Sequence, residues 1–477
     1  MLNKLKYSFL KSAVLNSWFN GSIQLLSSLI AIPIVLVKLS VAEINVWFLF
    51  ASITAFGQTL VSGFARTFSR FITYAYSGLK IEDFKLITDK KETVFSESYD
   101  PSELSSIFAQ MKQINSLISV LFFLVIGSIG YFFLAYPISE MKDGSIGWLA
   151  YFMILAVGGL NLYFGLYTIF LQGIKKVGII QRTFGVVNLI GLLLILIVLF
   201  YHPTFLSIVL VYQSISLSAS ILIYFTAKKK LRQMNIVSTR QKFDFNLFSI
   251  VWDSAWKNGL TSIISGCLKH FSALLIAQWF SPVQSASFLF TKRIFDILEK
   301  FTAMTFTARL PYIAQLRSRG LYIELKLLLK QTILISFAVF ILGYITLITM
   351  GEFILGFIQS NVNLGTPTLI ILFSVATFLS RWSGIMVSVS NQSNKIIEHK
   401  NAVIIFFVFT ASLLLLYKSL SLLAFPMANI IALITAMPLI IYQVYKTIDT
   451  SFYRFERFVF LPAFALLLLI NLIYYLS

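Results

Sequence analysis

The sequence is poor in charge and in cysteine. Only 12% of its 477 residues are Asp, Glu, Lys or Arg, about half of the roughly 25% that is usual in soluble domains. Because 58% of the residues are hydrophobic, a water-soluble fold would lack the interior to cover them, so the lipid bilayer is the expected solvent. The single cysteine, Cys267, excludes an internal disulfide and is expected to be a small core residue.

Acidic residues are scarce as well. The 19 Asp and Glu residues oppose 38 Lys and Arg residues, which gives a net charge of +19. Such a balance is often typical of nucleic-acid binding, but the basic residues here stand between apolar runs, which favours a membrane protein without a nucleic-acid partner. Glycine-rich phosphate loops, His/Cys metal-ligand spacings and Ser/His/Asp arrangements are also missing, so we expect no enzyme, no metal and no cofactor.

Long apolar runs fill most of the chain, and about 20 mostly apolar residues suffice to span a bilayer as a helix. Twelve predicted spans lie at 12–37, 46–75, 114–136, 147–172, 183–201, 206–227, 253–279, 285–314, 328–350, 365–390, 402–420 and 421–446. A further apolar run at 458–476 follows a charged connector and predicts an extra C-terminal helix, and only Lys418 marks the break at 420. The first run is too long for a signal-peptide core and is expected to be a membrane helix.

Basic residues alternate with these spans. If the N-terminus lies inside, 26 of the 38 Lys and Arg residues fall in cytoplasmic segments and 3 in outside segments. Positive segments stay in the cytoplasm, so the split predicts a multi-pass protein with a cytoplasmic N-terminus. The largest inside segment, 78–112, is polar and of mixed charge, and a short surface helix is expected there.

The two halves of the chain carry similar short runs, and we interpret them as a repeat. Trp18-Phe19-Asn20-Gly21 matches Trp256-Lys257-Asn258-Gly259, and Phe48-Leu49-Phe50 matches Phe288-Leu289-Phe290, with Arg70 beside the counterpart of Arg309. The offset of about 240 residues corresponds to six helices plus a linker, so both halves have the same orientation. The predicted fold is all-α, with two parallel-repeat bundles of six helices. The predicted parts are an N-terminal bundle at 1–227, a basic linker at 228–250, a C-terminal bundle at 251–447, and a connector with the extra helix at 448–477.

Several charges lie inside the predicted spans, where each costs roughly 2.5–3.5 kcal/mol on insertion scales. The candidate site residues among them are the basic Arg66, Arg70, Lys269, Lys292, Arg293, Lys300 and Arg381 and the acidic Asp296 and Glu299. An excess of buried positive charge predicts a cavity that binds an anion such as a phosphate or pyrophosphate. The alternative is an internal salt-bridge network, since 292, 296 and 300 share one helix face. Asp296, Glu299 and His270 either couple an ion gradient or only balance their neighbours.

One stretch resembles a known family. Residues 43–48 read Glu43-Ile44-Asn45-Val46-Trp47-Phe48, followed by Gly63-Phe64 and by Arg70-Phe71-Ile72-Thr73-Tyr74-Ala75. These runs resemble the entry and the end of the second helix in O-antigen flippases, the polysaccharide exporters of the multidrug/oligosaccharidyl-lipid/polysaccharide (MOP) superfamily. The motif covers about 35 residues, and the two-bundle pattern extends the resemblance over most of the chain. The extra helix at 458–476 departs from the family's twelve-helix pattern.

The resemblance implies a flippase of the bacterial inner membrane. Its substrate would be an undecaprenyl-pyrophosphate-linked oligosaccharide, moved from the cytoplasmic to the periplasmic leaflet by alternating access around a cationic cavity. Arg70 matches the family's arginine, whereas the other deep charges map onto no fixed motif. Membrane lipids, a polysaccharide polymerase and a chain-length regulator are the other implied partners, and a proton or sodium gradient is the expected energy source.

Other functions fit the same pattern. A multidrug exporter of the same superfamily often uses membrane acids in its first bundle, whereas Glu43, Glu140 and Asp143 all fall in predicted loops here. A lipid II flippase would also take a pyrophosphate lipid, but usually has fourteen helices. A non-transporting scaffold of a polysaccharide assembly complex is the alternative from another class. Charge reversal at Arg66 and Arg381 would distinguish transport from a scaffold role.

Overall fold

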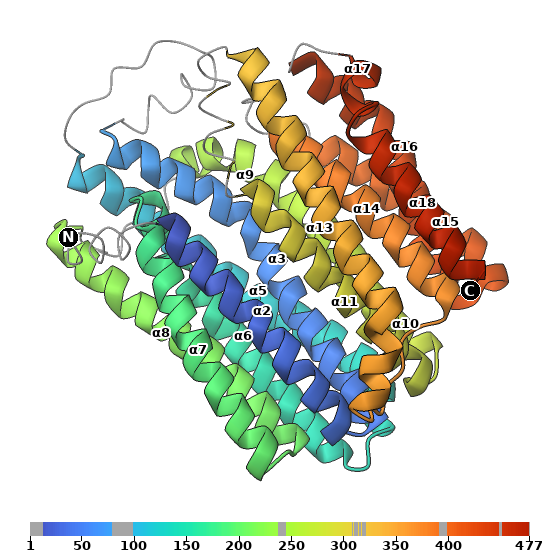
Figure 1. Ribbon diagram of the computed structural model, residues 1–477. Coiled ribbons are helices and arrows are strands. Elements are labelled where there is room, and N and C mark those ends of the chain that lie inside the picture. Colours follow the sequence, from blue (N-terminus) through green and yellow to red (C-terminus); the bar gives the residue numbers. More distant parts are fainter. Residues whose placement is uncertain are drawn as a thin grey trace, which may run out of the picture. The chain divides into compact units, whose positions relative to one another are not determined.

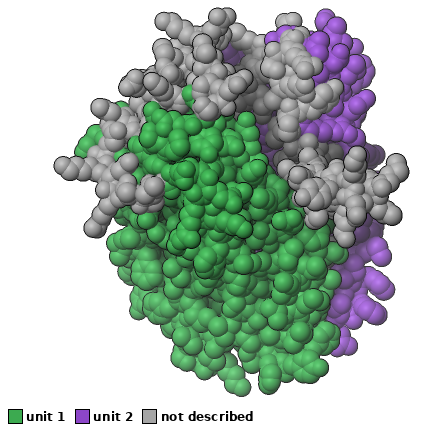
Figure 2. Space-filling model, turned by 90° about the vertical axis from the view of Figure 1, so that its left-hand side faces the viewer, with its two compact units in different colours: residues 1–282 green, residues 283–477 purple. Residues whose placement is uncertain are grey.

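The structure is a computed structural model, drawn as a ribbon in Figure 1. It describes residues 13–78, 99–236, 245–307, 309, 313, 316, 321–390, 398–447 and 451–476. Every regular element in these ranges is a helix, as the sequence predicts. The elements fall into two units, residues 1–282 and 283–477, which Figure 2 colours green and purple.

The first unit holds the N-terminal helices. They are α2 (Ala13–Lys38), α3 (Val41–Tyr76), α5 (Pro101–Ser139), α6 (Gly144–Gly173), α7 (Val177–Tyr201), α8 (Phe205–Gln233), α9 (Phe245–Gly266), the π-helix η2 (Cys267–Phe271) and α10 (Ser272–Trp279). Helix α6 packs against both α3 and α8, while α2 packs against α7 and α9 packs against α3. Glycine permits one of these close approaches, because a Cβ on Gly173 would lie 2.4 Å from Ile72 Cγ2 and 3.1 Å from the Ser69 carbonyl oxygen.

The second unit holds the C-terminal helices. They are α11 (Pro282–Thr307), α13 (Tyr322–Phe357), α14 (Pro367–Ser390), α15 (Glu398–Leu420), the 3₁₀-helix η3 (Ser421–Leu423), α16 (Ala424–Thr447), α17 (Phe452–Glu456) and α18 (Phe460–Leu476). Helix α14 packs against α16, and α15 packs against α16. The weakly marked break at 420 is confirmed, since Ser421 has a φ of 51° and the chain reverses into α16 there.

A helix occupies each of the twelve predicted spans, although the helix in the span 285–314 is described only as far as Thr307. Ten stretches of described helix are long and apolar enough to cross a membrane, and one of them, 399–442, is folded into α15 and α16. Helix α11 is not among the ten because its central turns carry five charged side chains. The protein is therefore a multi-pass membrane protein. The C-terminal apolar run forms the 17-residue α18, and whether it spans stays a prediction.

The repeat is visible in burial and packing. Phe48-Leu49-Phe50 on α3 and Phe288-Leu289-Phe290 on α11 are buried at all six positions. The pair α6 and α8 in the first unit has its equivalent in α14 and α16 in the second. Equal burial at matched positions is expected when the same helix of a bundle occurs twice.

Helix ends and connectors differ in detail from the prediction. Helix α5 begins at Pro101, with the Asp100 carboxylate capping it, so the end of the segment 78–112 extends a membrane helix. Residues 79–98 and the N-terminal lysines at 4, 6 and 11 lie outside the described residues. The basic run at 228–232 is helical, as the last turns of α8, and 237–244 is not described. The two units divide after Pro282, while the predicted division at a linker 228–250 stays a prediction.

Helix α18 is attached to the second unit by a buried polar cluster. The Asn471 side chain, 5% exposed, accepts a hydrogen bond from the Tyr344 hydroxyl (2.6 Å) on α13 and one from Ser374 (3.2 Å) on α14. Its amide nitrogen in turn donates to Ser374 Oγ (3.1 Å). Because buried polar groups are stable only when hydrogen-bonded, this cluster fixes the register of α18 on its neighbours.

Candidate functional site

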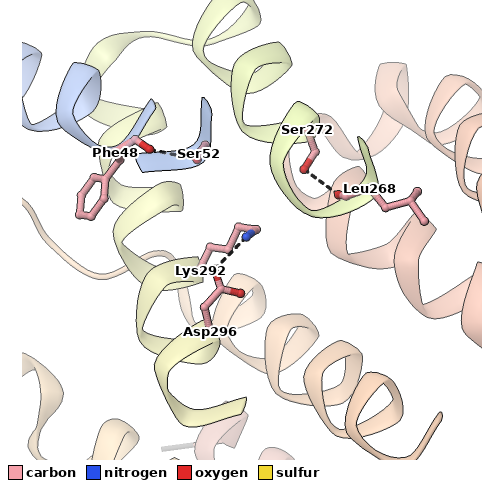
Figure 3. Close-up of polar contacts among 6 residues, drawn as sticks. All are labelled: Phe48, Ser52, Leu268, Ser272, Lys292 and Asp296. Carbon is pink, nitrogen blue, oxygen red and sulfur yellow. Dashed lines mark hydrogen bonds and ion pairs between the residues drawn. The ribbon is translucent and has the colours of Figure 1, made fainter. Parts of the chain in front are cut away.

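The charged stripe predicted on α11 is present. Lys292 Nζ lies 3.0 Å from Asp296 Oδ2 one turn further along, and their side chains are 18% and 31% exposed (Figure 3). Arg293 and Glu299 are half-buried, and Lys300 is exposed. Part of the charge on this helix is thus balanced internally, as the salt-bridge alternative expects, while Arg293 makes no ion pair with any described residue.

Arg381 lies inside the second unit. It is 7% exposed and donates hydrogen bonds from Nε to Ser336 Oγ (3.1 Å) and from Nη2 to the Thr302 carbonyl oxygen (3.4 Å). Its guanidinium carbon lies 5.9 Å from the centre of the Phe306 ring, and Glu299 acts on it electrostatically. In this structure, Arg381 therefore holds α11, α13 and α14 together, and its predicted contact with substrate stays a prediction.

Arg66 and Arg70 lie on α3 in the first unit. The backbone of Arg66 is helical, and its side chain lies outside the described part. Arg70 is half-buried, with its guanidinium carbon 5.7 Å from the centre of the Phe71 ring. Its Nε is buried and has no hydrogen-bond partner among the described residues. A buried donor of this kind is costly unless water or a ligand accepts its hydrogen bond, so Arg70 has capacity for an anion.

Lys269 and His270 lie in the π-helix η2, which interrupts the long helix of α9 and α10. Lys269 is exposed and His270 is half-buried. The Ser272 hydroxyl donates to the Leu268 carbonyl oxygen (3.1 Å), which helps to satisfy the backbone where the helix widens (Figure 3). Single π-helical turns inside α-helices occur frequently at functional sites, and here the turn carries both predicted site residues.

The acidic residues of α2 to α8 lie at helix ends. Glu43 forms a capping box with Ser40 at the start of α3, and the carboxylates of Asp100 and Asp143 cap α5 and α6. Glu103 stands in the first turn of α5, and Glu140 is its C-cap. Within 13–78 and 99–236, no acid therefore lies in the middle of a helix, and no group of three or more His, Cys, Asp or Glu side chains in the described chain could hold a metal ion.

The predicted site residues divide between the two units. The first unit carries Arg66, Arg70, Lys269 and His270, and the second carries Lys292, Arg293, Asp296, Glu299, Lys300 and Arg381. Within the second unit, the structure pairs Lys292 with Asp296, and Glu299 lies close enough to Arg381 to act on it electrostatically.

Comparisons with known proteins find no family model and no curated protein that matches the chain. Solved structures do match. An inward-facing multidrug resistance MATE transporter of the MOP superfamily aligns with a TM-score of 0.64 over 91% of this chain and 99% of its own, at 10% identity. This chain has the MOP transporter fold. The likeness at such identity concerns the fold alone.

Two further structures share the MOP fold. A MOP superfamily transporter from Pyrococcus furiosus, described as having a binding pocket of reverse polarity, aligns with a TM-score of 0.61 at 11% identity, over 93% of this chain and 98% of its own. The lipid II flippase MurJ, in an inward closed conformation, aligns with a TM-score of 0.57 at 12% identity, over 96% of this chain and 92% of its own. The predicted fold class is thereby confirmed, and the O-antigen flippase resemblance is supported as far as this fold.

Sequence reasoning missed one buried acid of the MOP fold in this chain. Glu456 on α17 is fully buried, and its carboxyl oxygens accept hydrogen bonds from the Tyr445 hydroxyl, from Trp382 Nε1 (3.2 Å) and from the Phe460 backbone nitrogen (3.1 Å). The sequence places Glu456 between two arginines in a charged connector, which indicates a solvated residue. Its donors come from 382 and 445, so only the tertiary structure reveals its burial.

Proposed function

We propose that this chain is a flippase that moves an undecaprenyl-pyrophosphate-linked oligosaccharide from the cytoplasmic to the outer leaflet of the bacterial inner membrane. The observation that carries the proposal is the sign of the charges that lie away from helix ends. Arg70 and Arg293 make no ion pair with a described residue, whereas the acids of α2 to α8 are used at helix ends. Cations without an ion pair inside predicted membrane spans favour an anionic substrate.

Pyrophosphate suits these groups chemically. A guanidinium presents planar N–H pairs that match the oxygens of a phosphate, and such charge-assisted hydrogen bonds are stronger than neutral ones. The unsatisfied Nε of Arg70 and the half-buried Arg293 offer these donors, with Lys269 as a further cation on η2. The MOP fold is also that of a protein named as a lipid II flippase. Arg66, Lys292, Lys300 and Arg381 remain secondary candidates for the same role.

The test is flipping in proteoliposomes that contain a fluorescent polyprenyl-pyrophosphate saccharide, with a membrane-impermeant quencher outside. We expect Arg293→Gln to slow flipping about tenfold or more, because one lost charge-assisted contact is worth roughly 1.5–3 kcal/mol. The matched control is Arg232→Gln, which removes an exposed cation from the end of α8. Normal flipping by Arg293→Gln together with Arg70→Gln would contradict the proposal.

A multidrug exporter is the second candidate, because the solved MOP structures include transporters described as multidrug resistance proteins. Asp296 and Glu299 on α11 are acids that could meet a cationic drug. Cation efflux by the same proteoliposomes, lost in Glu299→Gln and unaffected by the pyrophosphate lipid, would favour this function. A protein that moves neither class would support the scaffold alternative.

A further inference from the structure

The short helix α17 presents basic and aromatic side chains outward. Tyr453 and Phe458 are 67% and 56% exposed, and Arg454 and Arg457 are exposed beside them. Lys330 of α13 joins the group, since its Nζ lies 5.4 Å from the centre of the Phe458 ring. We call these five residues the α17 surface.

The inward side of α17 is fixed. Phe455 is 2% exposed and Glu456 is fully buried, with its carboxyl group hydrogen-bonded to side chains of α14 and α16 and to the backbone at the start of α18. The Ser451 hydroxyl caps the helix by accepting from the Arg454 backbone nitrogen (3.4 Å). A five-residue helix has little stability alone, so these contacts determine which side chains face outward.

Positive charge gathers around one exposed ring of the α17 surface. The Arg457 guanidinium carbon lies 4.5 Å from the centre of the Phe458 ring, and Lys330 Nζ lies over the same ring. Lys330 Nζ also lies 5.7 Å from the centre of the Phe455 ring. Lys330, Arg454 and Arg457 make no ion pair within the described chain, and the acid of α17 points inward. The surface is therefore preorganised and carries positive charge that no acid of the described chain pairs with.

This combination fits a lipid headgroup better than a soluble anion. Tryptophan and tyrosine are enriched at membrane–water interfaces, where their amphipathic rings lie at headgroup depth, and Tyr453 is exposed here. The apolar helix α18 begins three residues after Arg457 and continues for 17 residues. Lysine and arginine near an anionic leaflet each contribute about 1 kcal/mol of attraction. The basic end of α8 differs, because Lys228 and Lys230 are hydrogen-bonded to Tyr224 and Gln233 on the same helix.

We propose that the α17 surface is a binding site for the phosphate of an anionic phospholipid headgroup. Lys330 and Arg457, which both lie over the Phe458 ring, contact the phosphate, and Arg454 adds a third donor. The site is separate from the charges of α11, and the proposal does not depend on what the protein transports.

The test is native mass spectrometry of the full chain from phosphatidylcholine nanodiscs with and without phosphatidylglycerol. We expect the wild type to retain phosphatidylglycerol and the triple variant Lys330→Gln, Arg454→Gln, Arg457→Gln to bind it about a hundredfold more weakly, since each cation contributes a factor of about five. The control Lys228→Gln, Lys229→Gln, Lys230→Gln removes the same charge from α8 and should bind normally. Equal losses in both triple variants would overturn the proposal in favour of diffuse attraction to net charge.

Two further measurements complete the test. Phe458→Leu keeps all three cations and removes the ring, and we expect it to weaken binding severalfold while the thermal unfolding temperature stays unchanged. A polyprenyl pyrophosphate added to the nanodiscs distinguishes the other phosphate source. If the triple variant binds phosphatidylglycerol like the wild type and loses only the pyrophosphate lipid, the surface is a substrate-docking site and the proposal is wrong.

Discussion

The Tyr445 hydroxyl donates a hydrogen bond to the Glu456 carboxyl group, and both side chains are buried. Burial raises the pKa of Glu456 above its ordinary value of 4.5, although the bonds from Tyr445, Trp382 and Phe460 act in the opposite direction. Desolvation disfavours the charged form of a carboxyl group, and three neutral donors compensate only in part. No basic side chain pairs with Glu456 in the described chain.

Glu456 should make the protein less stable as the pH rises. A carboxyl group whose pKa is higher in the folded than in the unfolded protein contributes its full stability below the unfolded value of 4.5. That contribution is lost as the pH rises through the folded pKa. We expect Glu456→Gln to remove this part of the pH dependence, measured as the melting temperature of purified protein from pH 4 upward. If the melting temperatures of the wild type and of Glu456→Gln changed with pH in the same way, the pH dependence would not come from Glu456.

Asp143, which caps α6, should contribute a pH dependence of stability with the opposite sign. Hydrogen bonds from the Ser145 side chain and backbone lower the pKa of Asp143 below its ordinary value of 3.8. Its stabilising contribution is present above pH 3.8 and is lost as the pH falls through the folded pKa. The difference in melting temperature between the wild type and Asp143→Asn should therefore narrow on acidification. A difference that widens in acid would show that the cap does not depend on ionised Asp143.

Alanine substitutions at two glycines of α6 should change the stability of the protein in opposite directions. A Cβ at Gly173 would meet Ile72 and the Ser69 carbonyl oxygen, whereas a Cβ at Gly159 would meet nothing within 4 Å. Gly173→Ala should lower stability by about 1–3 kcal/mol through overpacking. Gly159→Ala should raise it by up to about 1 kcal/mol, because alanine favours the helix. Thermal unfolding of both variants in one detergent measures the contrast, and similar shifts would argue against the close approach of α6 and α3.

Arg381 should affect stability more than substrate binding. Arg381→Lys cannot reproduce the two-point contact with Ser336 and the Thr302 carbonyl oxygen, so we expect a loss of about 1–3 kcal/mol. Under the proposed flippase function, folded protein that remains should still flip the pyrophosphate lipid, in contrast to Arg293→Gln. Melting temperature and flipping rate per folded molecule distinguish the two effects. An unchanged melting temperature with lost flipping would return Arg381 to the substrate site.

The buried amide of α18 offers another test. Asn471→Leu leaves the Tyr344 hydroxyl without its acceptor and should cost about 1–3 kcal/mol. The neighbouring Leu472 is 55% exposed, so Leu472→Ala is the matched control and should change stability little. Limited proteolysis after α16 reports whether α18 has left its neighbours. Equal protection in wild type and Asn471→Leu would show that the polar cluster does not hold the helix.

The sequence predicts the helices well because each is a long apolar run, and even the hairpin at Ser421 could be placed from one lysine, Lys418. Apolarity cannot reveal helix that continues beyond an apolar run, so α5 begins 13 residues before the predicted span 114–136, and α8 ends 6 residues after the predicted span 206–227. The roles of single charged residues are harder to predict from the sequence, because they depend on partners that are distant along the chain. The partners of Arg381, Ser336 and the Thr302 carbonyl, lie on two other helices and cannot be read from the sequence, while its contact with substrate stays a prediction. The π-helix at Lys269 has no signature in the sequence.

Two adjacent residues of α14, Arg381 and Trp382, form hydrogen bonds with different neighbouring helices. Arg381 is hydrogen-bonded to α11 and α13, and the next residue, Trp382, is hydrogen-bonded to Glu456 on α17. A rotation of α14 about its own axis would break both sets of bonds at once. Motion in the second unit should therefore carry α11, α13, α14 and α17 as one block, and labels placed on these four helices should keep constant mutual distances in every conformation that the protein adopts.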